Sequence, residues 1–211
     1  MRPFQFITHS NSRFNYVEGA KQALEGGCRW IQLRMKNKSD SEIEEAASLL
    51  KPLCSAYGAT FILNDRVDLA LKVKADGVHL GKSDTDAAEA RKLAGASFII
   101  GGTANTFNDI VALANKGVDY IGLGPYQFTS TKEKLSPILG LDGYRDIANR
   151  CKQAGIELPI VAIGGITRED IPALLETDIP GIAVSSAILS AADPIKETKE
   201  IVNILNRSKH G

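Results

Sequence analysis

The chain has 211 residues, of which 44% are hydrophobic and 24% charged, and its 25 basic and 25 acidic residues leave no net charge. This length and composition predict a single domain over residues 1–211 with a sizeable core. Because a neutral chain has no overall field, we expect no nucleic-acid or membrane partner, and any anion site must be built from local groups.

The N-terminal segment and the cysteines predict a cytoplasmic protein. Residues 1–9 become polar too soon for a signal peptide, and no apolar run approaches the roughly 20 residues of a membrane-spanning helix. Cys28, Cys54 and Cys151 are odd in number and widely spaced. This pattern indicates reduced, buried thiols rather than a disulfide framework or a zinc site.

The first part of the chain predicts a strand, a helix and a second strand. The first strand is expected over residues 4–8, and Asn15 with Glu18 has the spacing of a capping box at the start of the helix. The second strand, 30–36, alternates strictly, with Ile31, Leu33 and Met35 on one face and Gln32, Arg34 and Lys36 on the other. Inside a barrel, such a polar face needs bonding partners.

Six more strand–helix units follow. We predict strands at 60–63, 77–81, 98–103, 120–123, 159–165 and 181–186, and helices that begin near Ser39, Val67, Asp84, Asn108, Leu141, Thr167 and Ile195. Apolar strands alternating with helices predict a parallel sheet covered by helices. Eight units favour a single (β/α)8 TIM barrel over an open doubly wound sheet, and no Gly-x-Gly-x-x-Gly follows the first strand.

The loop after the sixth strand contains candidate anion-binding groups. Pro125 ends that strand, and residues 126–141 form a long connection of the kind that usually carries function. Thr129, Thr131 and Lys132 supply donors suited to an anionic oxygen. The alternative interpretation is a solvated loop tip of mixed charge.

Polar residues also collect at the predicted carboxyl ends of the other strands, where barrel active sites lie. They are Gln32, Arg34, Lys36, Asn64, Asp65, Asp84, Thr103, Gly164, Gly165, Ser185 and Ser186. Taken singly, Asp65, Asp84 and Thr167 fit helix N-caps. His79, inside a strand, is expected to be packed or hydrogen-bonded rather than catalytic. The whole set at one end of one barrel nevertheless indicates a site.

The chemistry of this set suits two phosphorylated substrates. Carboxylates beside arginine and lysine suit a diphosphate bound with Mg²⁺. Gly164–Gly165 and Ser185–Ser186 follow the seventh and eighth strands, where barrels often bind a monophosphate. With histidines only at positions 9, 79 and 210, no Ser-His-Asp or Cys-His set is present. The pattern predicts a two-substrate transfer.

The motifs in their order along the chain resemble the thiamine-phosphate synthase family. They are Gln32–Lys36, Asn64–Asp65, Ala75–Gly81 with Asp84, Gly124–Pro125, Thr129–Lys132, Ala162–Ile166 and Ser185–Ile188. The resemblance implies a Mg²⁺-dependent transferase that condenses 4-amino-2-methyl-5-hydroxymethylpyrimidine diphosphate with hydroxyethylthiazole phosphate. The implied products are thiamine phosphate and diphosphate.

The resemblance also implies a role for each matching residue. The pyrimidine diphosphate contacts fall on Gln32, Arg34, Lys36, Asn64, Thr103 and Lys132, of which Arg34, Lys36 and Lys132 are the catalytic charges. The metal ligands fall on Asp65 and Asp84, and the thiazole phosphate contacts on Thr129, Thr131, Gly165, Ser185 and Ser186. Thr103 stands where the family usually has serine, and Met35 replaces a commonly acidic residue.

The implied mechanism is dissociative: diphosphate leaves first, and the thiazole nitrogen captures a pyrimidine methylene cation. Such a step needs stabilisation of the leaving group and little general base. Three alternatives remain open at this point: a thiazole tautomerase-like relative, an aldolase that uses Lys132 as a Schiff base, and a non-catalytic binder of thiamine precursors. The sequence leaves a homo-oligomer open as well.

Overall fold

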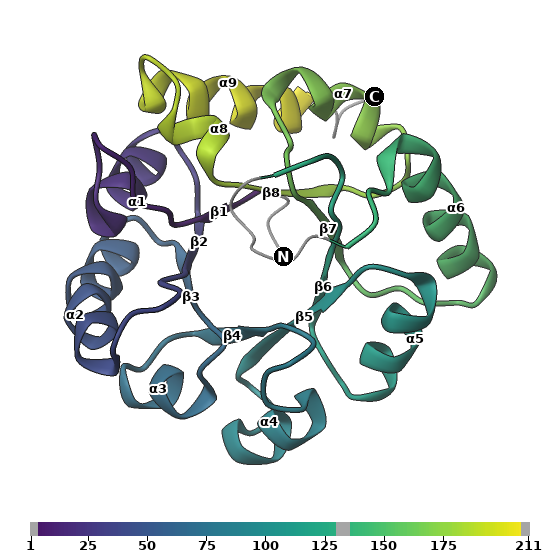
Figure 1. Ribbon diagram of the computed structural model, residues 1–211, viewed down its shortest axis with the longest axis horizontal. Helices are drawn as coiled ribbons and strands as arrows, with labels where there is room; N and C mark the ends of the chain where they lie inside the picture. The colour runs from purple at the N-terminus through teal and green to yellow at the C-terminus, as the bar shows by residue number, and fades with distance from the viewer. Residues whose placement is uncertain (1–3, 130–135, 208–211) are drawn as a thin grey trace.

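A computed structural model describes residues 4–129 and 136–207, and over these ranges eight parallel strands close into one barrel in chain order. The helices form a ring outside the strands (Figure 1), which confirms the predicted (β/α)8 TIM barrel. The strands are β1 (Phe4–Ile7), β2 (Trp30–Leu33), β3 (Thr60–Asn64), β4 (Gly77–Leu80), β5 (Ile99–Ala104), β6 (Tyr120–Leu123), β7 (Ile160–Ile163) and β8 (Gly181–Val184).

Each strand is followed by at least one helix. They are α1 (Tyr16–Glu25), α2 (Asp40–Ala56), α3 (Val67–Lys72), α4 (Ala87–Ala94), α5 (Phe107–Asn115), α6 (Gly140–Gln153), the 3-10 helix η1 (Arg168–Asp170), α7 (Ile171–Leu175), α8 (Ser186–Leu189) and α9 (Pro194–Arg207). The short α8, directly after β8, was not predicted. None of the helices in the described ranges is long and apolar enough to cross a membrane.

The predicted starts of the first two helices are confirmed. Asn15 with Glu18, and Ser39 with Glu42, form reciprocal capping boxes at the starts of α1 and α2. The second strand is shorter than predicted, because it ends at Leu33 rather than at residue 36.

The buried side chains form two layers, one between the strands and the helices and one inside the barrel. Successive residues of β2 alternate between these two layers. Ile31 and Leu33 belong to the outer layer beneath the helices. Gln32 faces the interior, where its side-chain amide donates to Gln5. The small inner cluster consists of Ile7, Trp30, Ile62, Tyr120, Val161 and Ala183. The interior is thus a packed core that becomes polar toward the site.

Two aspartates at strand ends prove not to be helix caps. The predicted helix start at Asp84 is wrong, since α4 begins after Asp86, whose carboxylate accepts a hydrogen bond from Ala88 N at 2.9 Å. Asp65 is not the N-cap of α3 either, because Arg66 holds that position. Thr167 does start η1, where its backbone N–H donates to the Asp170 carboxylate at 2.8 Å. The capping explanation therefore accounts for Thr167 alone.

The amino-terminal end of the barrel provides a stability prediction. The Asp119 carboxylate accepts hydrogen bonds from Ile100 N at 2.7 Å and from Arg91 at 2.6 Å. Asp119→Ala would leave a strand N–H without its partner, so we expect the free energy of unfolding to fall by about 1–3 kcal/mol in urea titrations. Asp146→Ala, which removes only a surface ion pair with Arg150, should cost about 0.5 kcal/mol or less. Equal losses in the two variants would contradict this assignment.

Candidate active site

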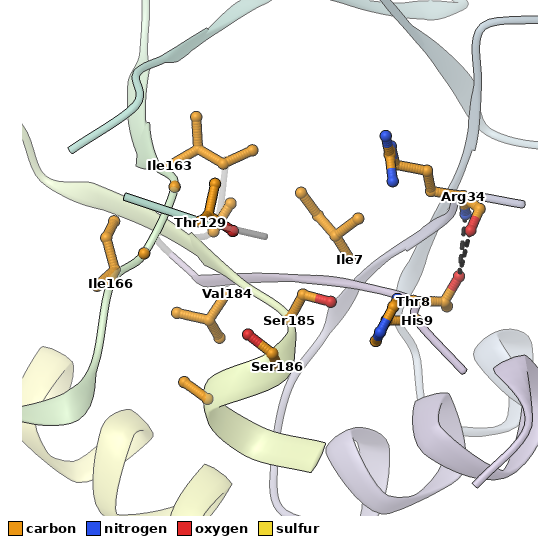
Figure 2. Close-up of a pocket in the computed structure, with 14 residues that line it drawn as sticks. Ile7, Thr8, His9, Arg34, Thr129, Ile163, Ile166, Val184, Ser185 and Ser186 are labelled. Atoms are coloured by element: carbon orange, nitrogen blue, oxygen red, sulfur yellow. Dashed lines mark hydrogen bonds between the residues drawn. The ribbon is translucent and has the colours of Figure 1, made fainter. Parts of the chain in front are cut away.

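A pocket opens at the carboxyl ends of β1, β2, β7 and β8. Figure 2 shows Thr129 and Ile163 on one side of it, Arg34 and Thr8 on the other, and Ser185 with Ser186 between them. The Thr8 hydroxyl accepts a hydrogen bond from Arg34 N at 2.9 Å. The end of β1 thereby holds the backbone of the arginine that follows β2.

The wall formed by β7 requires glycine. Gly164 and Gly165 have φ values of 97° and 70°, in the region that favours glycine. A Cβ on Gly165 would lie 2.5 Å from the carbonyl oxygen of Phe128. Only glycine at position 165 therefore lets Gln127 and Phe128 pack closely against the end of β7.

The first turn of α8 forms the base of this pocket. Ser186 is the first residue of α8, and Ser185, just before it, lies at the end of β8. The first N–H groups of a helix have no partner within the helix, and they point toward an anion placed at its start. With the hydroxyls of Thr129, Ser185 and Ser186, this end of the pocket suits a monophosphate.

A carboxylate pair lies across the barrel, at the ends of β3 and β4. Asp65 forms an ion pair with Lys36, and its φ of 70° is unusual for a residue other than glycine. Asp84 accepts a hydrogen bond from Gly81 N at 2.6 Å. Partial burial, together with a hydrogen bond and charge repulsion from Asp65, raises the pKa of the Asp84 carboxyl. Two acids held against each other in this way favour a bound cation.

The donor set fits Mg²⁺. No group of three or more His, Cys, Asp or Glu side chains gathers as a metal cage within the described ranges. Mg²⁺ does not need such a cage, because it usually takes one or two carboxylates together with substrate phosphates and water. Asp65 and Asp84 could offer two hard oxygen ligands to such an ion, and Lys36 lies beside Asp65 with a charge for an anionic oxygen.

The remaining predicted residues lie at or near the same end of the barrel. Asn64 is the last residue of β3, and Thr103 lies near the end of β5, where its hydroxyl is 2.9 Å from His79 Nε2. The structure thus brings together Gln32, Arg34, Lys36, Asn64, Asp65, Asp84, Thr103, Thr129, Gly165, Ser185 and Ser186 at this end of the barrel. Thr131 and Lys132 lie outside the described residues.

Sequence reasoning missed three residues of this region, Thr8, His9 and Tyr120. Thr8 and His9 line the pocket, and they follow β1 directly, so the rule that sites lie at strand ends would have found them. His79 is hydrogen-bonded, as predicted, to Thr103 in β5 and to Tyr120 in β6, but Tyr120 was interpreted only as an apolar strand residue. No spacing in the sequence indicates that pair.

A closed parallel eight-stranded barrel, with a pocket and a carboxylate pair at the carboxyl ends of its strands, defines the class of TIM-barrel enzymes. Comparison with known proteins specifies the family. A family model described as "Thiamine monophosphate synthase" matches residues 4–188, so the chain belongs to this family.

Individual relatives agree. A thiamine-phosphate synthase of Phocaeicola vulgatus is 58% identical over 200 residues, which cover 95% of this chain and 96% of the relative. One from Bacteroides fragilis is 56% identical over 204 residues, or 97% of this chain and all of the relative. The solved structure of thiamine phosphate pyrophosphorylase from Pyrococcus furiosus is 36% identical, with a TM-score of 0.86 over 97% of this chain and 96% of that one.

Proposed function

We propose that the barrel acts as a single catalytic domain of a thiamine-phosphate synthase, a transferase that joins an aminopyrimidine methyl diphosphate to a thiazole phosphate and releases diphosphate. The observation that carries this proposal is the pairing of two separate anion regions at one barrel end. One consists of Asp65, Asp84 and Lys36, and the other of the pocket at Gly165 and Ser186. A transfer between two phosphorylated substrates needs both.

Each region has its own task in the proposed reaction. Lys36 and Lys132, together with Arg34 from the wall of the neighbouring pocket, neutralise the charge that develops on the departing diphosphate, which favours bond breaking. Asp65 and Asp84 would hold Mg²⁺, which would supply further stabilisation of that charge. The pocket at Gly165 orients the thiazole by its phosphate, so that the ring nitrogen meets the methylene carbon.

The free, buried cysteines support a reducing compartment for this enzyme. Cys28, Cys54 and Cys151 are all buried and form no disulfide. Burial raises the pKa of the Cys28 thiol to about 11, which keeps the thiol protonated and unreactive. This thiol usage favours the proposed cytoplasmic location.

A coupling assay tests the proposed function directly. The purified chain, freed of metal by a chelator, is mixed with the aminopyrimidine diphosphate and the thiazole phosphate, with and without Mg²⁺. We expect thiamine phosphate and diphosphate to form in equal amounts only when Mg²⁺ is added. Binding of both substrates without coupling would instead indicate a binder of thiamine precursors, and borohydride trapping on a lysine would indicate an aldolase.

The thiazole side is tested by Thr129→Val, which removes one hydroxyl from the pocket at nearly constant volume. We expect the KM for the thiazole phosphate to rise about tenfold, since a hydrogen bond to a charged group contributes about 1.5–3 kcal/mol. The KM for the pyrimidine diphosphate should stay unchanged in steady-state assays. A rise confined to the pyrimidine substrate would reverse this assignment of sides.

A further inference from the structure

A chain of hydrogen bonds crosses the barrel interior from β2 to β5. Gln32 Nε2 donates to Gln5 Oε1 at 3.2 Å, and Gln5 Nε2 donates to the Tyr120 hydroxyl at 3.3 Å. That hydroxyl lies 3.0 Å from His79 Nδ1, and His79 Nε2 lies 2.9 Å from Thr103 Oγ1. These five residues, called the interior chain below, connect two of the six residues assigned above to the pyrimidine diphosphate, Gln32 and Thr103.

The strands around the interior chain leave space for its two rings. A Cβ on Gly101 would lie 2.1 Å from Tyr120 Cζ, and a Cβ on Gly122 would lie 2.9 Å from His79 Cε1. Trp30 packs edge-on against the Tyr120 ring, with ring centroids 4.8 Å apart. The ring positions are therefore set by close packing, and their hydrogen bonds belong to the architecture of the barrel.

When the Tyr120 hydroxyl accepts from one of its two neighbours and donates to the other, a neutral histidine beside it allows two arrangements of protons. In the first, Tyr120 donates to His79 Nδ1, His79 Nε2–H donates to Thr103, and the Thr103 hydroxyl proton can reach a ligand. In the second, every donor is reversed, so Thr103 donates its proton to His79. The amide of Gln32 turns with the chain, because its NH₂ group faces Gln5 in the first arrangement and its carbonyl oxygen does so in the second.

The hydrogen bonds of the structure select between the two. Gln5 donates to the Tyr120 hydroxyl, so the proton of that hydroxyl is available for His79 Nδ1. Burial raises the pKa of Tyr120, which keeps this proton on the phenol. A diphosphate oxygen can only accept hydrogen bonds, and Thr103 can donate to it only in the first arrangement.

We propose that His79 and Tyr120 are positioning residues that hold His79 in the Nε2–H tautomer, and so make Thr103 a donor and the Gln32 side-chain carbonyl an acceptor. The inference rests on the proposed function. The two ends of the interior chain then match the two ends of one substrate. Thr103 donates to the anionic diphosphate, and Gln32 accepts from the exocyclic amine. A substrate with a hydrogen-bond acceptor in place of the amine could bind Gln32 only if every hydrogen bond of the interior chain were reversed.

The tautomer is measured directly on the wild-type protein. Protein labelled with ¹⁵N at histidine, saturated with Mg²⁺ and inorganic diphosphate, is examined by long-range ¹H–¹⁵N correlation NMR. The His79 signals are identified by their loss in His79→Gln. We expect a protonated, pyrrole-type Nε2 and an unprotonated Nδ1. The opposite pattern, or a doubly protonated ring, would overturn the proposal even if wild-type coupling is normal, whereas absent coupling would count against the proposed function.

Variants test whether the interior chain of hydrogen bonds contributes to binding of the pyrimidine diphosphate. Tyr120→Phe should raise the KM for the pyrimidine diphosphate about tenfold and leave the KM for the thiazole phosphate unchanged, since about 1.4 kcal/mol corresponds to a factor of ten. Tyr144→Phe is the matched control: the Tyr144 hydroxyl is also buried and hydrogen-bonded, to Leu123 O and Ile163 N, but lies outside the interior chain. Equal pyrimidine KM values in the two variants would contradict the proposal.

Replacement of His79 separates donation from simple packing. His79→Gln keeps an amide donor near the position of Nε2 and should stay within about threefold of the wild-type pyrimidine KM, a difference below 1 kcal/mol. His79→Asn is too short to reach Thr103 and should show the tenfold loss of Tyr120→Phe. If asparagine served as well as glutamine, donation to Thr103 would not be the function of His79.

Discussion

Asp84→Asn is expected to reduce Mg²⁺-dependent turnover by about a thousandfold while it makes the metal-free protein more stable. Both effects follow from the loss of one carboxylate charge, which is needed to hold Mg²⁺ and which destabilises the fold when no metal is bound. The raised pKa of the Asp84 carboxyl, due to its burial and to Asp65, means that the folded protein binds a proton there more readily than the unfolded chain. The ionised carboxylate therefore destabilises the fold as pH rises through its normal titration range, and Mg²⁺ relieves that cost.

The asparagine variant removes the charge and keeps an oxygen that can accept the bond from Gly81 N. We therefore expect a higher Tm than wild type without metal, and a Tm that Mg²⁺ no longer raises, both measured by differential scanning calorimetry at neutral pH. This readout is independent of turnover. A folded Asp84→Asn protein with full activity would refute the metal assignment.

Asp86 provides the matched control, because it stands two residues further along and is a helix N-cap. Asp86→Ala should lose about 1 kcal/mol of stability, the usual cost of a lost cap, and retain its activity and its response to Mg²⁺. The two variants are thus expected to change stability in opposite directions, and only Asp84→Asn is expected to lower turnover. Asp65→Ala should behave as Asp84→Asn does in turnover.

The second large effect concerns departure of the diphosphate. Lys36→Met should lower kcat about a hundredfold and change the pyrimidine KM by less than about tenfold, because a charge aimed at the leaving group acts mainly in the transition state. Lys38→Met is the control, since Lys38 has a similar exposure but forms a surface ion pair with Glu42 at 2.8 Å. Similar kcat losses in both would contradict a specific role for Lys36.

A substrate substituent tests the dissociative order of events. An electron-withdrawing group on the pyrimidine makes the methylene cation harder to form, so single-turnover coupling by the wild-type protein should slow strongly. A direct displacement by the thiazole nitrogen would respond far less. Near-equal single-turnover rates for the normal and the electron-poor diphosphate would exclude the dissociative route.

The barrel and its polar end were predictable from the sequence. Alternation of apolar strands with capped helices is a local property, as the capping box of Asn15 and Glu18 illustrates, and eight such units favour a closed barrel over an open doubly wound sheet. Because all strands run in the same direction, residues just past their ends, such as Asp65 and Ser185, had to meet at one end of the barrel.

The contacts that each of those residues makes depend on the closed fold and could not be predicted from the sequence. In the sequence, Asp84 and Asp86 are equally suited to start a helix; in the fold, Asp86 caps α4, and Asp84 turns back to Gly81 N and lies beside Asp65. His79 and Tyr120 are 41 residues apart and meet only because the barrel closes around them. Local spacing predicts strands and helices, whereas pKa shifts and hydrogen bonds between side chains depend on neighbours that the closed barrel alone brings together.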